Sequence, residues 1–265
     1  MIRNYKKKFD LQNKLAFVAG GQGYIGNEIV NALASINCRV VVLDIYRTKR
    51  NKDKKIQNEY VDLSKTSKLE KFFKKIIKKH GMADIFINAS YPRTKDWKKN
   101  SFQKINLKSF EANIKIHLNS YTWCSKIMAE NMVKNKINGS IINLSSIYGL
   151  VGQDLEIYKG TDMTENLSYS VIKGGINNFT KQMSSYYGKF NIRVNAICPG
   201  GVINFEDKKK LKIQKLFERN YISKVPLKRF ARTDEIASTV IFLSSDASSY
   251  ITGTLLPVDG GWTAI

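Results

Sequence analysis

The stretch Leu15-Ala-Phe-Val-Ala-Gly-Gly-Gln-Gly-Tyr-Ile-Gly26, close to the start of the chain, decides the fold. Its first five residues are apolar, which is typical of a strand that is buried on both faces of a sheet. Glycines follow directly, and apolar side chains then recur at helical spacing, at Ile25, Ile29, Val30 and Leu33. A strand, a glycine-rich turn and a helix in this order form the context in which such glycines bind a dinucleotide.

The glycine-rich turn is well suited to a phosphate ligand. Glycine lets the backbone turn tightly and approach a pyrophosphate, and the following helix offers free N–H groups and the positive end of its dipole. A simple tight turn would need similar glycines, but it would not need this strand and this helix around them. We therefore predict cofactor contacts from the turn at Gly20, Gln22, Gly23, Tyr24, Ile25 and Gly26.

Apolar strands alternate with amphipathic helices along the rest of the chain. Helices are predicted over 69–77 and 233–243, the latter with Thr233 as its N-cap, and 110–133 forms one long helix or two short ones. This alternation predicts one doubly wound α/β domain over residues 1–265, about seven parallel strands wide, with helices on both faces. The strands after the first are expected at 39–44, 60–61, 84–88, 140–144, 192–197 and 255–258.

The net charge of +22 is the unusual feature of the composition, with 44 Lys and Arg against 22 Asp and Glu. A nucleic acid or an acidic membrane would explain such a charge. However, lysine far outnumbers arginine and lies in scattered runs, whereas proteins that read bases rely mostly on arginine. We therefore expect the charge to reflect composition, with no nucleic-acid or membrane partner, although it could attract an anionic substrate or cofactor.

Several other classes of protein do not match the sequence. No apolar run approaches the ~20 residues that span a bilayer, and polar residues follow the basic stretch 1–9 too closely for a signal peptide. The cysteines Cys38, Cys124 and Cys198 match no disulfide framework and no zinc motif. We expect buried free thiols, no metal site and a cytoplasmic location.

Asp44 is the candidate for selecting the cofactor. It ends the second predicted strand, where a carboxylate accepts hydrogen bonds from the adenosine ribose hydroxyls and repels a 2′-phosphate. This position favours NAD. Arg47 and Lys49 follow closely, however, and could accommodate NADP.

Tyr169 and Lys173 form a Tyr-x-x-x-Lys pair. On a helix, residues four apart share a face. An ammonium beside a phenol favours the phenolate and lowers its pKa from ~10, which makes the phenol a proton acceptor for an alcohol. A pair of this kind on an exposed surface would have no such role. The pair therefore indicates a catalytic site only together with the other motifs of the chain.

The motifs taken in order resemble the classical short-chain dehydrogenase/reductase family over essentially the whole length. Each motif alone is weak, but the ordered set is specific. The resemblance implies a Rossmann fold, an NAD(P)-dependent oxidoreductase and a homotetramer or homodimer. The set is the glycine turn, Asp44, Asp62-Leu63, Asn88-Ala89, Asn113, Ser146, Tyr169 with Lys173, Pro199-Gly200, and the closing Asp259-Gly260-Gly261.

The resemblance also implies the roles of individual residues. Tyr169 exchanges a proton with the substrate oxygen, Lys173 lowers the pKa of Tyr169 and holds the nicotinamide ribose, and Ser146 hydrogen-bonds the substrate oxygen. Asn113 holds a water in the proton relay. Hydride passes between the substrate carbon and the nicotinamide, which carries the redox chemistry. Further cofactor contacts are implied at Ile45, Asp62, Leu63, Asn88, Ala89, Ser90, Pro199, Gly200 and Val202, besides Asp44, Tyr169 and Lys173.

The sequence departs from the usual family pattern at three places. Gly20, Gly23 and Gly26 give the Gly-x-x-Gly-x-x-Gly spacing of the extended branch, which includes nucleotide-sugar epimerases. Asn204 stands where a carboxamide-binding threonine is common. Ser146 and Tyr169 are also unusually far apart, because an extra segment at about 151–167 separates them. We expect this insertion to border the substrate pocket, since loops at the carboxyl ends of parallel strands build the site.

The insertion and the motifs Tyr158-Lys-Gly-Thr161 and Pro199-Gly-Gly-Val202 resemble one branch more closely. Its members are bacterial dehydrogenases linked to flagellin glycosylation and to legionaminic or related nonulosonic acids. This resemblance implies a small-molecule substrate that is a sugar or sugar derivative and could be anionic. Trp97, in the lysine-rich loop after the fourth strand, either borders that pocket or lies on the surface.

The leading hypothesis is an oxidoreductase that acts on a secondary alcohol or ketone of a sugar-like molecule. A nucleotide-sugar epimerase or dehydratase that oxidises its substrate only transiently is the second, and the spacing of the glycine turn favours it. A non-catalytic dinucleotide-sensing protein is the third. The presence of Asn113, Ser146, Tyr169 and Lys173 together argues against the third hypothesis, because a binding protein would not need all four.

Overall fold

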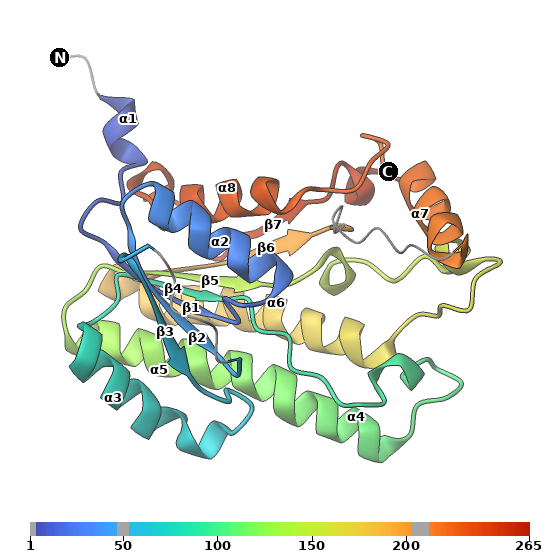
Figure 1. Cartoon of the computed structure of the whole chain (residues 1–265), viewed down its shortest axis with the longest axis horizontal. Coiled ribbons are helices and arrows are strands. Elements are labelled where there is room, and N and C mark those ends of the chain that lie inside the picture. Colours follow the sequence, from blue (N-terminus) through green and yellow to red (C-terminus); the bar gives the residue numbers. More distant parts are fainter. Residues whose placement is uncertain (1–3, 47–52, 203–211) are drawn as a thin grey trace.

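One sheet of seven parallel strands runs through the molecule in the order β3-β2-β1-β4-β5-β6-β7 (Figure 1). The computed structural model describes residues 4–46, 53–202 and 212–265. The sheet confirms the predicted doubly wound α/β fold. Its strands are β1 (Leu15–Ala19), β2 (Arg39–Asp44), β3 (Ile56–Tyr60), β4 (Ile85–Asn88), β5 (Ser140–Leu144), β6 (Arg193–Pro199) and β7 (Leu255–Val258).

Helices cover both faces of the sheet (Figure 1). Helices α2 and α8 pack on one face and α3, α5 and α6 on the other, each over its own apolar core. The described helices are α1 (Tyr5–Lys8), α2 (Tyr24–Ser35), α3 (Leu69–His80), α4 (Leu107–Asn113), α5 (Asn119–Lys134), α6 (Leu167–Tyr187), α7 (Lys212–Lys224) and α8 (Thr233–Ser244).

The strand order reverses direction between β1 and β4, which are neighbours although two strands separate them in the chain. Connections leave β1 toward one edge of the sheet and β4 toward the other. In open parallel sheets the loops at such a switch point part and leave a crevice at the carboxyl ends of the strands. The fold therefore places the ends of β1, β4 and β5 where a ligand site is expected.

Three predicted boundaries need correction. The third strand covers 56–60 and not 60–61, because β3 is an edge strand whose polar Gln57, Asn58 and Glu59 give no apolar run. The helical segment 107–134 is continuous but contains a π-helical turn over Ile114–Leu118. Thr233 is the first residue of α8, and the N-cap is Arg232, whose N–H donates to the Glu235 carboxylate at 2.8 Å.

The three cysteines are buried free thiols, as predicted. Within 4–46, 53–202 and 212–265, no group of three His, Cys, Asp or Glu is placed to hold a metal ion. The described helices also include none that is long and apolar enough to cross a membrane.

The glycine turn is held together by backbone contact. Gly20 has φ +74°, a conformation that side-chain-bearing residues rarely adopt, and its N–H donates to the Leu43 carbonyl at 2.9 Å. A Cβ on Gly26 would lie 2.1 Å from the Gly20 carbonyl oxygen. The first turn of α2 thus rests directly on the turn after β1, and no side chain fits between them.

We predict that Gly26→Ala lowers the free energy of unfolding by about 1–3 kcal/mol, because the new methyl group must push the turn away from α2. Gly188→Ala is the matched control, since its backbone is helical (φ −57°, ψ −37°) and no atom lies within 4 Å of the added Cβ. The control should gain about 0.5–1 kcal/mol. Urea denaturation of both variants measures the difference, and equal stabilities would contradict the close packing of Gly26.

Candidate active site

The glycine turn and the end of β2 are joined through Asp44. One carboxylate oxygen of Asp44 accepts the Gln22 N–H at 2.9 Å and the other accepts the Tyr46 N–H at 3.2 Å. Gly23 is the N-cap of α2 and supplies no side chain there. The structure thus places Asp44, the turn and the N-terminus of α2 together, with Ile45 half exposed beside them. Arg47 and Lys49, which bear on the choice between NAD and NADP, lie outside the described residues.

The ends of β3 and β4 lie on either side of this turn along the sheet. After β3, the Asp62 carboxylate accepts the Ser64 N–H at 3.1 Å and Leu63 is buried. After β4, a Cβ on Gly20 would lie 2.5 Å from the α-carbon of Ser90, so the turn backs directly onto this loop. The predicted residues Asn88, Ala89 and Ser90 therefore contact the turn although they are distant in sequence.

Two features of this crevice fit a dinucleotide. Gly23 is exposed and begins the N-terminal turn of α2 without a side chain, so a phosphate can approach the main chain closely there. The side-chain nitrogen of Asn88 is fully buried and has no hydrogen-bond partner among the described residues. Such a buried donor is costly unless a partner is supplied. The end of β6 completes this side through Pro199, Gly200 and Val202, and Val202 bridges to Ala231. Asn204 lies outside the described residues.

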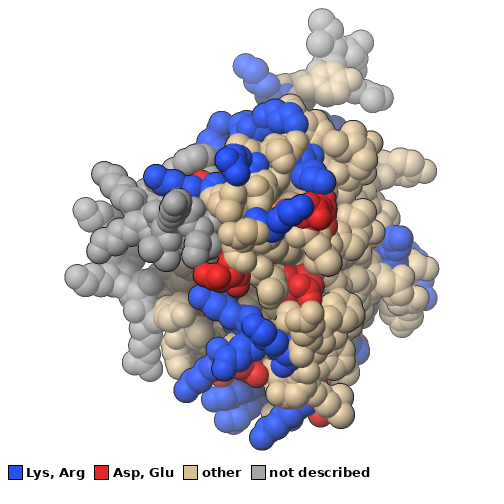
Figure 2. All heavy atoms as spheres, turned by 90° about the vertical axis from the view of Figure 1, so that its right-hand side faces the viewer, with Lys and Arg blue, Asp and Glu red and all other residues tan. Residues whose placement is uncertain are grey.

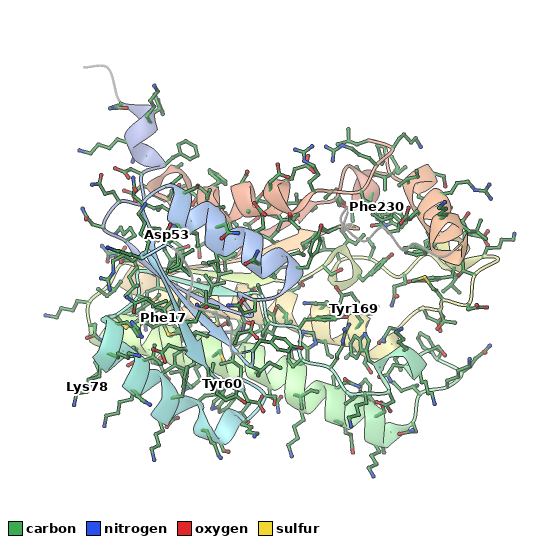
Figure 3. All side chains as sticks on the ribbon, viewed as in Figure 1. Phe17, Asp53, Tyr60, Lys78, Tyr169 and Phe230 are labelled. Carbon is green, nitrogen blue, oxygen red and sulfur yellow. The ribbon has the colours of Figure 1, made fainter. Side chains whose placement is uncertain are left out.

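Helix α6 brings Tyr169 and Lys173 to the end of β5. Asn166 caps the helix by accepting the Tyr169 N–H at 2.9 Å. Lys173 is 3% exposed, and its ammonium donates to the Leu144 carbonyl at 2.8 Å. Ser146 follows β5 and hydrogen-bonds the Tyr169 side chain, which places three of the four predicted catalytic side chains together. Tyr169 lies in the half of the molecule toward which the strands run (Figure 3).

Burial sets the protonation of this group. Desolvation raises the pKa of Tyr169, and the hydrogen bond from Ser146 only partly opposes it. The lowering predicted from the Tyr-x-x-x-Lys spacing is therefore wrong for the protein alone, because the Lys173 ammonium is directed at Leu144. Burial also lowers the pKa of Lys173 to about 7. Tyr169 is consequently held as a phenol, and Lys173 titrates near neutrality.

Asn113, the fourth predicted catalytic residue, is fully buried at the end of α4. Its side-chain nitrogen donates to Thr94 Oγ1 at 2.9 Å, to Asn100 Oδ1 at 3.1 Å and to the Ser109 carbonyl at 2.9 Å. Its Oδ1 accepts the Thr94 N–H at 3.1 Å. The side chain fixes the loop after β4 against the helix, and both of its amide hydrogens are used.

Aromatic rings surround Tyr169. The ring centroids of Tyr91, Trp97 and Tyr148 lie 6.0, 6.1 and 6.4 Å from that of Tyr169, all edge to face. Trp97, whose position the sequence left open, is 8% exposed and packs against the Tyr169 ring.

Sequence reasoning missed Tyr91 and Tyr121. Tyr91 directly follows Ser90, and Tyr121 lies eight residues after Asn113 on one helical segment, at a spacing that returns to the same face. The position of Tyr91 beside Ser90 and the helical spacing of Tyr121 from Asn113 could have identified both tyrosines as residues near the site.

The insertion at 151–167 packs between α6 and α7. Gln153 donates to the Asn166 carbonyl at 2.9 Å and to Ser170 Oγ at 2.8 Å, and it accepts from the Tyr158 hydroxyl at 3.1 Å. The Tyr158 ring stacks on Phe217 of α7 with centroids 5.9 Å apart. The segment is therefore fixed to the start of the helix that carries Tyr169.

The charged side chains lie mostly outside this group. Figure 2 views the molecule from the right-hand side of Figure 1, and it shows Lys and Arg in several separate groups with uncharged and acidic side chains between them. This distribution differs from the single continuous basic stripe that nucleic-acid binding surfaces present.

Known proteins resemble the chain over nearly its whole length. A family model described as Enoyl-(Acyl carrier protein) reductase matches residues 19–263. The post-translational flagellin modification protein A of Campylobacter coli is 30% identical over 95% of this chain and 99% of its own. A 3-oxoacyl-(acyl-carrier-protein) reductase of Thermotoga maritima is 26% identical over 95% of this chain and 98% of its own.

A solved structure gives the same result. The short-chain dehydrogenase of Leptospira borgpetersenii, crystallised with NAD⁺, is 28% identical and superposes with a TM-score of 0.85 over 99% of this chain and 97% of its own. Sequence, fold and grouped side chains agree, and the chain belongs to the short-chain dehydrogenase/reductase family of NAD(P)-dependent oxidoreductases.

Proposed function

We propose that this protein transfers hydride between NAD and a secondary alcohol or ketone carbon of a sugar or sugar-derived molecule, with Tyr169 as the acid and base. The observation that carries the proposal is the grouping of Ser146, Tyr169 and Lys173 within a ring of aromatic side chains. NAD is favoured over NADP because the Asp44 carboxylate lies beside the glycine turn. The NAD⁺ in the Leptospira relative supports the same choice. Within this proposal, residues 1–265 act as one cytoplasmic domain.

The chain's own residues would handle the proton and the position of the substrate. Bound NAD supplies the hydride acceptor or donor. Ser146 holds the substrate oxygen, and Tyr169 donates its phenolic proton to that oxygen in the reductive direction or takes a proton from it in the oxidative direction. Because burial raises the pKa of Tyr169, the phenol is the form present at neutral pH, which favours donation to a carbonyl oxygen.

The side chains that surround Tyr169 support a sugar-like substrate. Tyr91, Trp97 and Tyr148 offer ring faces and edges against which a carbon skeleton can pack. The Tyr148 hydroxyl is buried beside that of Tyr158, and this pair can hydrogen-bond a hydroxylated ligand. A molecule that combines C–H faces with many hydroxyls meets both requirements. The flagellin-modification relative agrees with this substrate class.

The decisive experiment follows nicotinamide absorbance over a panel of sugars, sugar phosphates, nucleotide sugars and sugar acids with both cofactors. We predict turnover with a member of the panel, and a loss of about 100-fold or more in kcat for Tyr169→Phe, which cannot exchange a proton. Oxidation should accelerate from pH 7 to pH 10, since the tyrosinate fraction grows toward a pKa above the ordinary value, while reduction should not.

The outcomes separate the alternatives. Unchanged activity of Tyr169→Phe would remove Tyr169 from the chemistry. Purified protein that retains tightly bound cofactor, interconverts nucleotide sugars and shows no net absorbance change would identify an epimerase or dehydratase instead. Cofactor binding without turnover of any panel member would favour a dinucleotide-sensing protein.

Arg93 supports an anionic form of the substrate. Its guanidinium lies over the Tyr91 ring, 5.3 Å from the centroid, and Tyr91 in turn touches Tyr169. No carboxylate in the described part of the chain forms a salt bridge with Arg93. A guanidinium in this position can pair with a phosphate or carboxylate of a molecule whose reacting carbon lies at Tyr169.

We predict that Arg93→Gln raises KM about tenfold for an anionic substrate and leaves KM for its neutral analogue unchanged, because one charge-assisted hydrogen bond of about 1.4 kcal/mol is lost. Lys98→Gln removes an exposed positive charge from the same loop and serves as the control, with little effect on either substrate. Steady-state kinetics of the variants with both substrates tests this prediction. Equal effects of the two substitutions would indicate a general electrostatic attraction by the positive charges of the loop, and not a specific contact with Arg93.

We also propose that the protein forms a homodimer or homotetramer through α5 and α6. Trp123 and Val171, on these two helices, are 44% and 43% exposed. Covering such apolar side chains favours association. Light scattering at assay concentration should give two or four times 30.2 kDa, and Trp123→Glu together with Val171→Glu should lower that mass. A monomeric mass for the unaltered protein would reject the proposal.

A further inference from the structure

His117 is a buried histidine that the proposed chemistry does not use. It lies in the π-helical turn after Asn113 and is 0% exposed. Neither of its ring nitrogens has a hydrogen-bond partner among the described residues. An unpaired buried polar group costs about 1–3 kcal/mol. An apolar residue at this position would avoid that cost, so the presence of an imidazole calls for a physical reason.

The surroundings of His117 connect it to Lys173. The imidazole packs against Tyr91 and Tyr121, with ring centroids 5.3 and 5.5 Å away. The Lys173 ammonium lies 6.0 and 5.1 Å from the centroids of the same two rings. Trp97 closes a further side at 6.3 Å. The His117 imidazole and the Lys173 ammonium therefore lie against the same two rings, although they come from different helical segments.

The hydrogen-bonding needs of the two groups are complementary. An ammonium has three N–H donors and no acceptor. The Leu144 carbonyl is the acceptor that the structure provides for Lys173. A neutral imidazole offers one acceptor nitrogen, and that of His117 is unused. Donors without acceptors and an acceptor without a donor thus occur side by side in the protein interior.

The other polar groups around these rings cannot take that place. The amide hydrogens of Asn113 are already donated, and its Oδ1 accepts the Thr94 N–H. The other titratable groups nearby all have a pKa raised by burial: Tyr91 from the loop after β4, Tyr121 and Cys124 from α5, Tyr169 from α6 and Cys198 from β6. Lys173, whose pKa is about 7, is consequently the nearby group that carries positive charge toward His117. Burial and this charge hold the pKa of His117 well below its usual value, so the imidazole is neutral.

We propose that His117 is a positioning residue whose acceptor nitrogen receives, through one buried water, a hydrogen bond from the Lys173 ammonium, and so keeps that ammonium charged and aligned beside Tyr169. A buried water between polar partners of this kind would hydrogen-bond both of them. Withdrawal of the acceptor leaves the ammonium more poorly solvated, and desolvation favours the neutral amine. The catalytic consequence rests on the proposed oxidoreductase function, whereas the consequence for Lys173 does not.

Two variants separate this role from simple packing. His117→Leu keeps an apolar volume and removes the acceptor, whereas His117→Gln keeps an acceptor oxygen. A packing role predicts that Leu is harmless and Gln is destabilising, because only Gln buries a polar group. The proposed role predicts the opposite order in both Lys173 titration and catalysis.

The direct measurement is the titration of the Lys173 Nζ resonance by heteronuclear NMR in the full chain without cofactor. The resonance is assigned by its loss in Lys173→Met. We expect the midpoint to fall by about one pH unit in His117→Leu and to stay near its original value in His117→Gln. His80→Gln, which changes the chain's other histidine, is the control and should leave the midpoint unchanged. An unchanged midpoint in His117→Leu overturns the proposal.

Kinetics provide the second measurement. With the substrate identified by the panel, kcat of His117→Leu should fall about tenfold and KM should change little, and the pH at which kcat decreases should shift in the same direction as the Lys173 midpoint. His117→Gln should restore most of the activity. A wild-type protein with no oxidoreductase activity would reject the proposed function while the NMR titration still decides the role of His117. An unaltered pH profile in His117→Leu would reject the positioning role alone.

Discussion

The Leu144 carbonyl, at the carboxyl end of β5, is the point on which the geometry of the site depends. It accepts the Lys173 ammonium at 2.8 Å and lies 3.1 Å from the Tyr121 hydroxyl, whose single proton is shared between this oxygen and the Ser90 carbonyl at 2.9 Å. One strand end thereby fixes α6, α5 and the loop after β4 relative to each other. Because a central strand is held on both edges by its neighbours, this point is rigid. Side chains attached to it gain their precision from the sheet.

A second set of bonds, centred on Asn100, positions the pieces that the sheet does not reach. Asn100 Oδ1 accepts from Asn113 Nδ2 at 3.1 Å and from Ser168 Oγ at 2.7 Å, and its own nitrogen donates to Ser109 Oγ at 3.0 Å. The start of α6, helix α4 and the loop between β4 and α4 thus meet at one buried amide. Fully satisfied networks of this kind specify a unique arrangement. Asn113 accordingly belongs to this network as much as to the catalytic set.

Local pattern was enough to predict most of the fold. The strands 39–44 and 140–144 have the predicted bounds because a largely apolar run marks a strand covered on both faces. The run 255–258 also has the predicted bounds, although β7 is a half-buried edge strand. The edge strand β3 was displaced because one side of it is exposed and polar. The residues that follow strand ends were predicted to converge, since parallel strands bring those ends to one edge. What the sequence could not provide was the environment of the converging groups.

Tyr169 shows why that environment is out of reach of spacing alone. Two residues four apart on a helix share a face, but whether the ammonium faces the phenol or a carbonyl depends on the strand packed against them. Here the Leu144 carbonyl takes the ammonium, and burial decides the direction of both pKa shifts. For the same reason the sequence did not indicate a role for His117, because that role depends on three aromatic rings and one ammonium from elsewhere in the chain.

The two buried charged residues differ in how far the protein itself supplies their hydrogen-bond partners. Among the described Asp, Glu, Lys and Arg residues only Asp44 and Lys173 are buried, and both belong to the candidate site. Burial of a charge is costly, so such charges are retained where they serve recognition or chemistry. Asp44 is satisfied within the chain by two backbone N–H groups. Of the three donors of Lys173, one is taken by Leu144 and one is assigned to the water at His117, which leaves one directed at whatever binds beside Tyr169. The Asp44 carboxylate is therefore held in place before binding and keeps acceptor capacity for the ribose hydroxyls, whereas the reacting end reaches its full set of hydrogen bonds only with its ligands in place.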